Sequence, residues 1–98
     1  MTSKEFETIF NDTIAGQYRA NEIELKSYID DCGEWFEVWV RGEIFFSIAF
    51  TYSEEYHNRF TVITLANLAI RTAHLMAYAE SNGKCIAYHA YVERRKAQ

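Results

Sequence analysis

The chain has 98 residues, of which 49% are hydrophobic and 16% aromatic, and this is too much apolar material for a disordered segment. Its 14 acidic and 10 basic residues give a formal net charge of −4 at pH 7. A surface that binds phosphates needs an excess of basic residues, so this balance disfavours nucleic acid as a partner. Because the length suits one core, we assign residues 1–98 to a single domain.

The N-terminal residues lack the basic, apolar and small-residue progression of a secretory signal. Residues 60–79 are apolar but include Asn67, Arg71 and His74, whereas a membrane span usually needs about 18 uninterrupted apolar residues. We therefore expect a cytoplasmic protein that makes no contact with a membrane. In that compartment Cys32 and Cys85 are expected to be reduced thiols.

The first third of the chain predicts a helix followed by a strand. Apolar residues at helical spacing predict an amphipathic helix from Ser3, with Ser3 or Thr2 as its N-cap and Gly16 near its end; they are Phe6, Ile9, Phe10 and Ile14. Polar and apolar residues then alternate over residues 22–30, which is typical of a strand with one solvated face. Residues 31–33 include a glycine and form the turn that follows.

The middle of the chain predicts two more strands, over residues 35–41 and 44–52, because both segments are β-branched and aromatic. Arg41, Gly42 and Glu43 join them in a tight hairpin. A polar loop over residues 53–58 precedes a long helix over residues 59–81, with Asn58 or Ser53 as its cap, and a last strand is expected over residues 84–92. The order α-β-β-β-α-β predicts an α+β fold with one antiparallel sheet and the helices packed on one face.

The order α-β-β-β-α resembles that of double-stranded-RNA-binding domains, in topology alone. Those domains grip phosphates with basic residues near the start of the second helix. Residues 58–61 offer only Arg59 at that place, so no RNA-binding function is expected.

Alternation along the strands sorts their side chains onto two faces. The face expected to pack on the helices carries Ile23, Leu25, Ile29, Phe36, Val38, Val40, Ile44, Phe46, Ile48, Phe50, Ile86, Tyr88, Ala90 and Val92. The opposite face combines aromatic rings with an arginine, a composition enriched at the centres of protein interfaces. We predict a partner-binding surface there, formed by Tyr28, Trp35, Glu37, Trp39, Arg41, Phe45, His89 and Tyr91. Coverage of these rings by loops, or a small-ligand site, are the alternatives.

The long second helix is apolar on all sides, although a helix with one buried face should have a polar side. Ala66, Ala69, Ala73 and Ala77 form a strip of small residues along it. That strip predicts close packing, either on the sheet and the first helix or in a homodimer. The residues of the homodimer hypothesis are Ala66, Leu68, Ala69, Ala73, Leu75 and Ala77.

No catalytic or metal-binding motif is recognisable. The spacing of His57, His74 and His89 matches no zinc motif. Cys85 and His89 lie on one face of the expected last strand but about 13 Å apart, too far for a nucleophile and its base. We expect no enzyme activity, no cofactor and no metal, with a small-molecule-binding or catalytic domain that uses His57, His89 and Cys85 as the alternative.

The sequence thus favours a small acidic protein-binding module that acts on a protein partner. An inhibitor or anti-defence protein of a phage or other mobile element is the specific form we expect, because carboxylates at suitable spacing imitate phosphates in a cationic groove. A purely structural homodimer is a further alternative.

Overall fold

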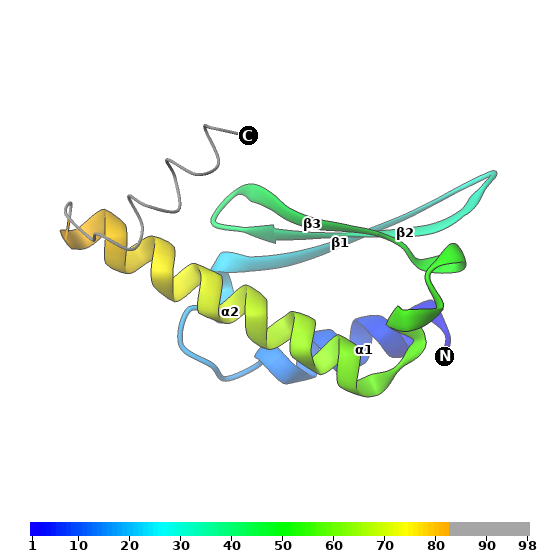
Figure 1. Cartoon of the computed structure of the whole chain (residues 1–98), viewed down its shortest axis with the longest axis horizontal. Coiled ribbons are helices and arrows are strands. Elements are labelled where there is room, and N and C mark those ends of the chain that lie inside the picture. Colours follow the sequence, from blue (N-terminus) through cyan, green and yellow to red (C-terminus); the bar gives the residue numbers. More distant parts are fainter. Residues whose placement is uncertain (83–98) are drawn as a thin grey trace.

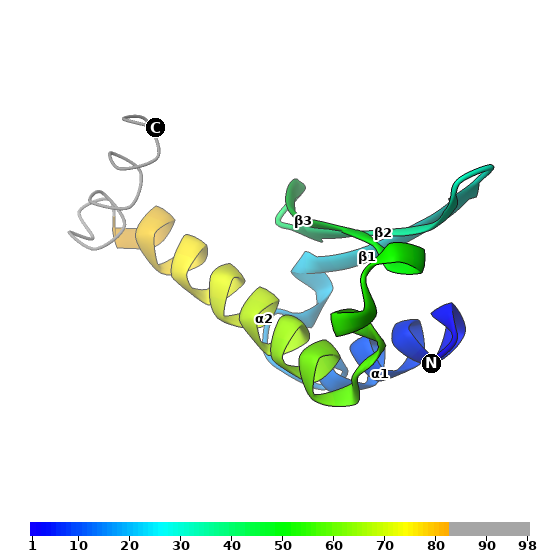
Figure 2. The same ribbon diagram turned by 45° about the vertical axis from the view of Figure 1, so that its right-hand side comes forward.

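A computed structural model describes residues 1–82 of the chain (Figure 1). Its helices and strands are α1 (Ser3–Ile14), β1 (Ile23–Asp30), β2 (Gly33–Val40), β3 (Glu43–Ala49) and α2 (Arg59–Asn82), with short 3-10 helices η1 (Ala20–Glu22), η2 (Phe50–Tyr52) and η3 (Glu54–His57). The strands form one antiparallel sheet in the order β1-β2-β3, and both helices lie on one side of it (Figure 2). The predicted α+β fold is confirmed. The strand expected over residues 84–92 lies outside the described residues.

Both long helices begin at polar caps that the sequence predicted. The Thr2 hydroxyl accepts a hydrogen bond from the backbone N–H of Glu5 at 3.1 Å, and the Glu5 carboxylate accepts one from the N–H of Thr2 at 3.2 Å. This capping box satisfies two N–H groups that a helix start would otherwise leave unpaired. At the start of α2, the Asn58 side chain accepts from the N–H of Phe60 at 2.8 Å.

Two tight turns connect the strands. Arg41 and Gly42 have φ angles of 52° and 82°, and two consecutive positive values are those of a type I′ hairpin turn. At the other end of β2, Gly33 has a φ of 144°, and a Cβ atom added there would meet the Thr51 hydroxyl at 2.5 Å. Glycine is therefore needed at residue 33 for its backbone angle and for the space that it leaves.

Strand β3 departs from the prediction in two ways. It ends at Ala49 rather than at residue 52, because the chain turns into η2 and places the Phe50 ring among the core rings of Phe6 and Phe36, at centroid distances of 5.4 and 5.5 Å. A bulge also interrupts its pairing with β2: Val38 lies opposite Phe46, whereas Trp39 lies opposite Ile44. Phe45 is thus the extra residue. Because of it, the residues of β3 that precede Phe45 lie on the opposite side of the sheet from the one that simple alternation predicts.

The core lies between the sheet and the two helices. Phe6 of α1 stacks on Phe36 of β2 with ring centroids 4.4 Å apart, and Phe10, Val38 and Val62 are buried beside them. The ends of the sheet extend past this core, which leaves Ile29 at 77% exposure and Ile44 at 52%. The prediction that these two isoleucines pack on the helices is wrong. Ile29 lies near the end of β1, beside the β1–β2 turn, and the bulge moves Ile44 to the other face.

Helix α2 is long and apolar enough to cross a membrane by length and composition alone. In this structure 39% of an apolar 18-residue stretch of the helix is buried, and the buried side chains of the core cluster pack against α1 and the sheet. The compact fold is consistent with a soluble protein whose longest helix serves the core.

Candidate functional site

The candidate site is the face of the sheet that points away from both helices (Figure 2). On this face Tyr28 lies opposite Trp35, and Lys26 lies opposite Glu37. The bulge adds Ile44, which lies opposite Trp39. Paired residues of neighbouring strands project to the same side, so these side chains form one continuous layer. We call it the outer sheet face: Lys26, Tyr28, Trp35, Glu37, Trp39 and Ile44.

Glu37 occupies the centre of the outer sheet face and holds two of its rings. Its carboxylate accepts one hydrogen bond from the indole N–H of Trp39 at 3.2 Å and another from the Tyr28 hydroxyl at 3.4 Å. The ammonium group of Lys26 lies 4.0 Å from the centre of the Trp39 ring, within the range of a cation–π contact. Burial, together with the nearby Glu37 carboxylate, raises the pKa of Tyr28, so its hydroxyl remains a hydrogen-bond donor.

Trp35 is the ring of this face with an unsatisfied polar atom. Its indole N–H is buried and makes no hydrogen bond of normal geometry among residues 1–82. The pKa of the Asp30 carboxyl is nevertheless lowered, first by attraction to the Trp35 indole and next by the backbone N–H of Cys32.

Within residues 1–82, no helix covers the outer sheet face. Trp35, Glu37 and Trp39 are each half-buried, although both helices lie on the other side of the sheet. Glu37 bonds both the Trp39 indole and the Tyr28 hydroxyl, and Lys26 lies over the Trp39 ring. Rings that are already restricted lose little side-chain entropy when a partner binds, which favours a surface of this kind for recognition.

Two residues predicted for this face lie elsewhere. The Arg41 guanidinium makes an ion pair with Glu22 at 2.6 Å and a second one with Glu80 of α2, because the left-handed turn directs its side chain toward the start of β1 and the end of α2. Phe45 is half-buried against the core cluster, since the bulge shifts it to the helix side. Their predicted place on the outer face is therefore wrong. Tyr28, Trp35, Glu37 and Trp39 do lie together, and His89 and Tyr91 are outside the described residues.

Sequence reasoning left Lys26 and Ile44 out of the site. Lys26 shares the face of Tyr28 by simple alternation. The signal that could have added it is its place on β1 close to Trp39 of the neighbouring strand, where its ammonium group lies over the ring. Ile44 was assigned to the core side because alternation was counted without the bulge.

The predicted homodimer residues do not share one face. Ala66, Ala69 and Ala73 are buried in the core cluster, where α2 packs on α1 and the sheet, and Ala77 is also buried. The alanine strip is therefore an internal contact and not a surface. Leu68 and Leu75 lie on the other side of α2 and are 47% and 56% exposed.

The histidines and cysteines in the described part of the chain form no reactive group. The imidazole of His57 stacks on Phe50 at a centroid distance of 4.1 Å, and its Nε2 lies 2.8 Å from the Phe50 carbonyl oxygen. Cys32 is an exposed free thiol, and within residues 1–82 no cluster of histidine, cysteine or acidic side chains could hold a metal ion. His89 and Cys85, the other residues of the catalytic alternative, lie outside these residues.

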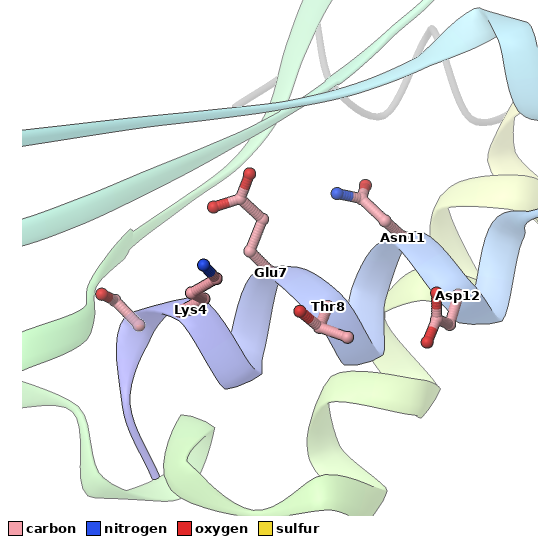
Figure 3. Close-up of a pocket in the computed structure, with 6 residues that line it drawn as sticks. Lys4, Glu7, Thr8, Asn11 and Asp12 are labelled. Atoms are coloured by element: carbon pink, nitrogen blue, oxygen red, sulfur yellow. The ribbon is translucent and has the colours of Figure 1, made fainter.

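A shallow depression of about 550 Å³ runs along α1 (Figure 3). It is lined by Ser3, Lys4, Glu7, Thr8, Asn11 and Asp12, all from this one helix. Glu7 and Asp12 point to different sides of the helix axis, so the polar groups do not converge on a point where a ligand could sit. The outer sheet face therefore stays the stronger candidate.

No protein-family model, curated protein or solved structure matches the chain. Its function is therefore inferred from the geometry of the described residues.

Proposed function

We propose that the protein is a protein-binding module that contacts its partner through the outer sheet face. The observation that carries this proposal is the arrangement of Trp35, Trp39 and Tyr28 around Glu37, on the side of the sheet away from both helices. Large rings with a polar atom dominate the binding energy at the centres of protein interfaces. Here such rings are gathered on one face of the sheet, and Glu37 bonds two of them.

The charge of the surface favours a partner with a basic contact region. Glu37 lies at the centre of the outer sheet face, the exposed carboxylates of Glu24 and Asp30 lie on the same side of β1, and the chain carries a net charge of −4. Opposite charge speeds association and rejects acidic competitors. The form of function we propose is a cytoplasmic inhibitor or anti-defence protein of a phage or other mobile element, which blocks a basic surface of its target.

The proposal is tested by capturing the partner from cells of the native host, identifying it by mass spectrometry and measuring its affinity for purified variants. Trp39→Ala should weaken binding by about 2 kcal/mol or more, roughly thirtyfold, because it removes a ring from the centre of the contact. The matched control is Tyr18→Ala, since Tyr18 is also an exposed aromatic residue but lies after α1, away from the sheet.

The control variant should bind within about 0.5 kcal/mol of wild type. Circular dichroism of each variant establishes that it is folded before its affinity is compared. Unchanged binding by folded Trp35→Ala and Trp39→Ala variants, with loss of binding in a variant of another surface, would contradict the proposal.

A further inference from the structure

Helix α2 has a second row of residues, three of them large and apolar, on the side away from α1 and the sheet. Its residues follow one another at alternating steps of four and three, and they are Thr64, Leu68, Arg71, Leu75 and Tyr78. Leu68, Leu75 and Tyr78 are 47%, 56% and 57% exposed. Steps that average 3.5 residues are the spacing by which one α-helix packs along another. We call this row the α2 seam.

The seam is distinct from the part of α2 that serves the core. Ala66, Ala69 and Ala73 face α1 and the sheet and are fully buried. The seam lies on the opposite side of the helix, and its large apolar residues are about half exposed, so no element within residues 1–82 covers it fully. An exposed helix side is expected to be polar, and three large apolar residues at helix-packing spacing favour an additional helix there.

The charge along α2 favours a second copy of this chain as that helix. Residues 59–79 contain no carboxylate, although the protein as a whole carries a net charge of −4. Two acidic molecules repel each other over most of their surface and can approach most closely where both lack acidic groups. The α2 seam is an elongated surface of this kind, with Arg71 as its one charged residue.

We propose that the protein forms a homodimer in which the α2 seams of two copies pack antiparallel. A two-fold axis near residue 73 places Leu68 of one copy opposite Tyr78 of the other, and Arg71 opposite Leu75. The same patch then serves on both copies, as a two-fold interface requires. Parallel packing would instead place the two Arg71 side chains in one layer, where their like charges repel.

The length of the seam limits the expected strength of the dimer. Residues 64–78 span about 21 Å of helix, which is a short contact for two packed helices. We therefore expect an equilibrium between monomer and dimer at micromolar concentration. The outer sheet face stays free in this dimer, so each dimer presents two copies of it, and the dimer does not depend on the proposed function.

The dimer is tested by sedimentation equilibrium of the full chain across the micromolar range. The average mass should rise from the 11.5 kDa of one chain toward twice that value with concentration. Leu75→Glu should keep the mass at that of the monomer, because it places a carboxylate in the seam. Ile29→Glu is the matched control, since Ile29 is more exposed than Leu75 but lies at the end of β1, and it should dimerise like wild type.

The circular dichroism of Leu75→Glu shows whether it is folded, and Leu68→Gln is the second variant if it is not. Trp39→Ala should leave the mass unchanged, which separates failure of the dimer from failure of the proposed function. A monomer at every concentration overturns the proposal. A monomer that floats with phosphatidylcholine and phosphatidylglycerol vesicles also overturns it and assigns the seam to lipid.

The antiparallel orientation is tested by disulfide formation in a background of Cys32→Ser and Cys85→Ser. A mixture of Leu68→Cys and Tyr78→Cys chains should form mixed disulfides, because these positions lie opposite each other. Each variant alone should form few, since its two cysteines would be about 15 Å apart along the helices. Efficient self-linking of each variant alone would contradict the orientation.

Discussion

The two sides of the sheet are both rich in large apolar residues, but they hold them in different ways. On the helix side Phe36, Val38 and Val40 are at most 2% exposed, because α1 and α2 cover them. On the outer side Trp35 and Trp39 are only half-buried, and no helix within residues 1–82 covers them. Full burial removes apolar area from water and stabilises the fold, whereas partial burial fixes a ring and leaves part of it available to a partner.

Helix α2 repeats this contrast around its own axis. The side that bears alanines lies within the core and brings the helix close to α1 and the sheet. The side that bears Leu68, Leu75 and Tyr78 is about half exposed. In both the sheet and α2, the large residues that stay partly exposed are those that no other described helix or strand covers.

The largest effect is expected from removing a ring on the covered side. Phe36→Ala should lower the free energy of unfolding by about 3–5 kcal/mol, because Phe36 is 2% exposed and packs on Phe6 and Phe50. The total stability of a small domain is about 5–15 kcal/mol, so this variant should be largely unfolded at moderate urea concentrations. Urea denaturation followed by circular dichroism measures the change.

Phe46→Ala is the matched control for coverage, since Phe46 of β3 is 38% exposed. It should cost clearly less than Phe36→Ala. Equal costs for the two variants would show that coverage by the helices does not set the stability of the sheet.

A smaller effect is expected where charges join the start of β1 to the rest of the fold. The pKa of Glu22 is lowered from 4.5, first by its hydrogen bond with Arg19 and also by Arg41. A carboxyl with a lowered pKa in the folded state stabilises the fold above its ordinary pKa, and this contribution disappears as the pH falls through the lowered value. Glu22→Gln should therefore be less stable than wild type at neutral pH, with the difference shrinking below pH 4.5.

Urea denaturation at a series of pH values measures this difference. Glu24→Gln is the control, because Glu24 is exposed and makes none of the ion pairs within residues 1–82. Its stability difference from wild type should be small at every pH. A Glu22→Gln difference that stays constant from neutral to acidic pH would show that the ion pairs with Arg19 and Arg41 do not contribute.

The smallest effect is expected on the outer sheet face. Lys26→Met keeps the apolar stem but removes the charge that lies over the Trp39 ring, and it should lower stability by about 0.5 kcal/mol. The same substitution in a Trp39→Ala background should cost nothing further, because the ring is absent. A double-mutant cycle in urea measures the coupling. An equal cost in both backgrounds would mean that the cation–π contact does not form.

Local signals in the sequence were enough to predict most of the elements. The Thr2 and Asn58 side chains accept hydrogen bonds from backbone N–H groups at the helix starts, and Arg41-Gly42 turns the chain within two residues. Each of these signals acts over a few residues, and this is why each could be recognised without the fold. The helical spacing of Phe6, Phe10 and Ile14 likewise identified the buried side of α1.

The outer sheet face was predicted in part, for a related physical reason. Tyr28, Trp35, Glu37 and Trp39 lie on β1 and β2, which pair without interruption, so simple alternation placed them correctly. Alternation failed on β3, because a bulge opposite Val38 and Trp39 adds one residue to that strand. A bulge is set by how two strands fit together and leaves no pattern along one of them.

Tertiary structure alone decided the partners of Arg41 and the role of the alanine strip. The ion pair of Arg41 with Glu80 joins residues far apart in the chain, and it forms because α2 crosses beneath the sheet toward that turn. The alanines of α2 were equally suited to an internal contact or a homodimer, and the position of α1 made the contact internal. Residue types and spacing determine what a side chain can pack against. Which other part of the chain packs against that side chain depends on how elements distant in the sequence are arranged.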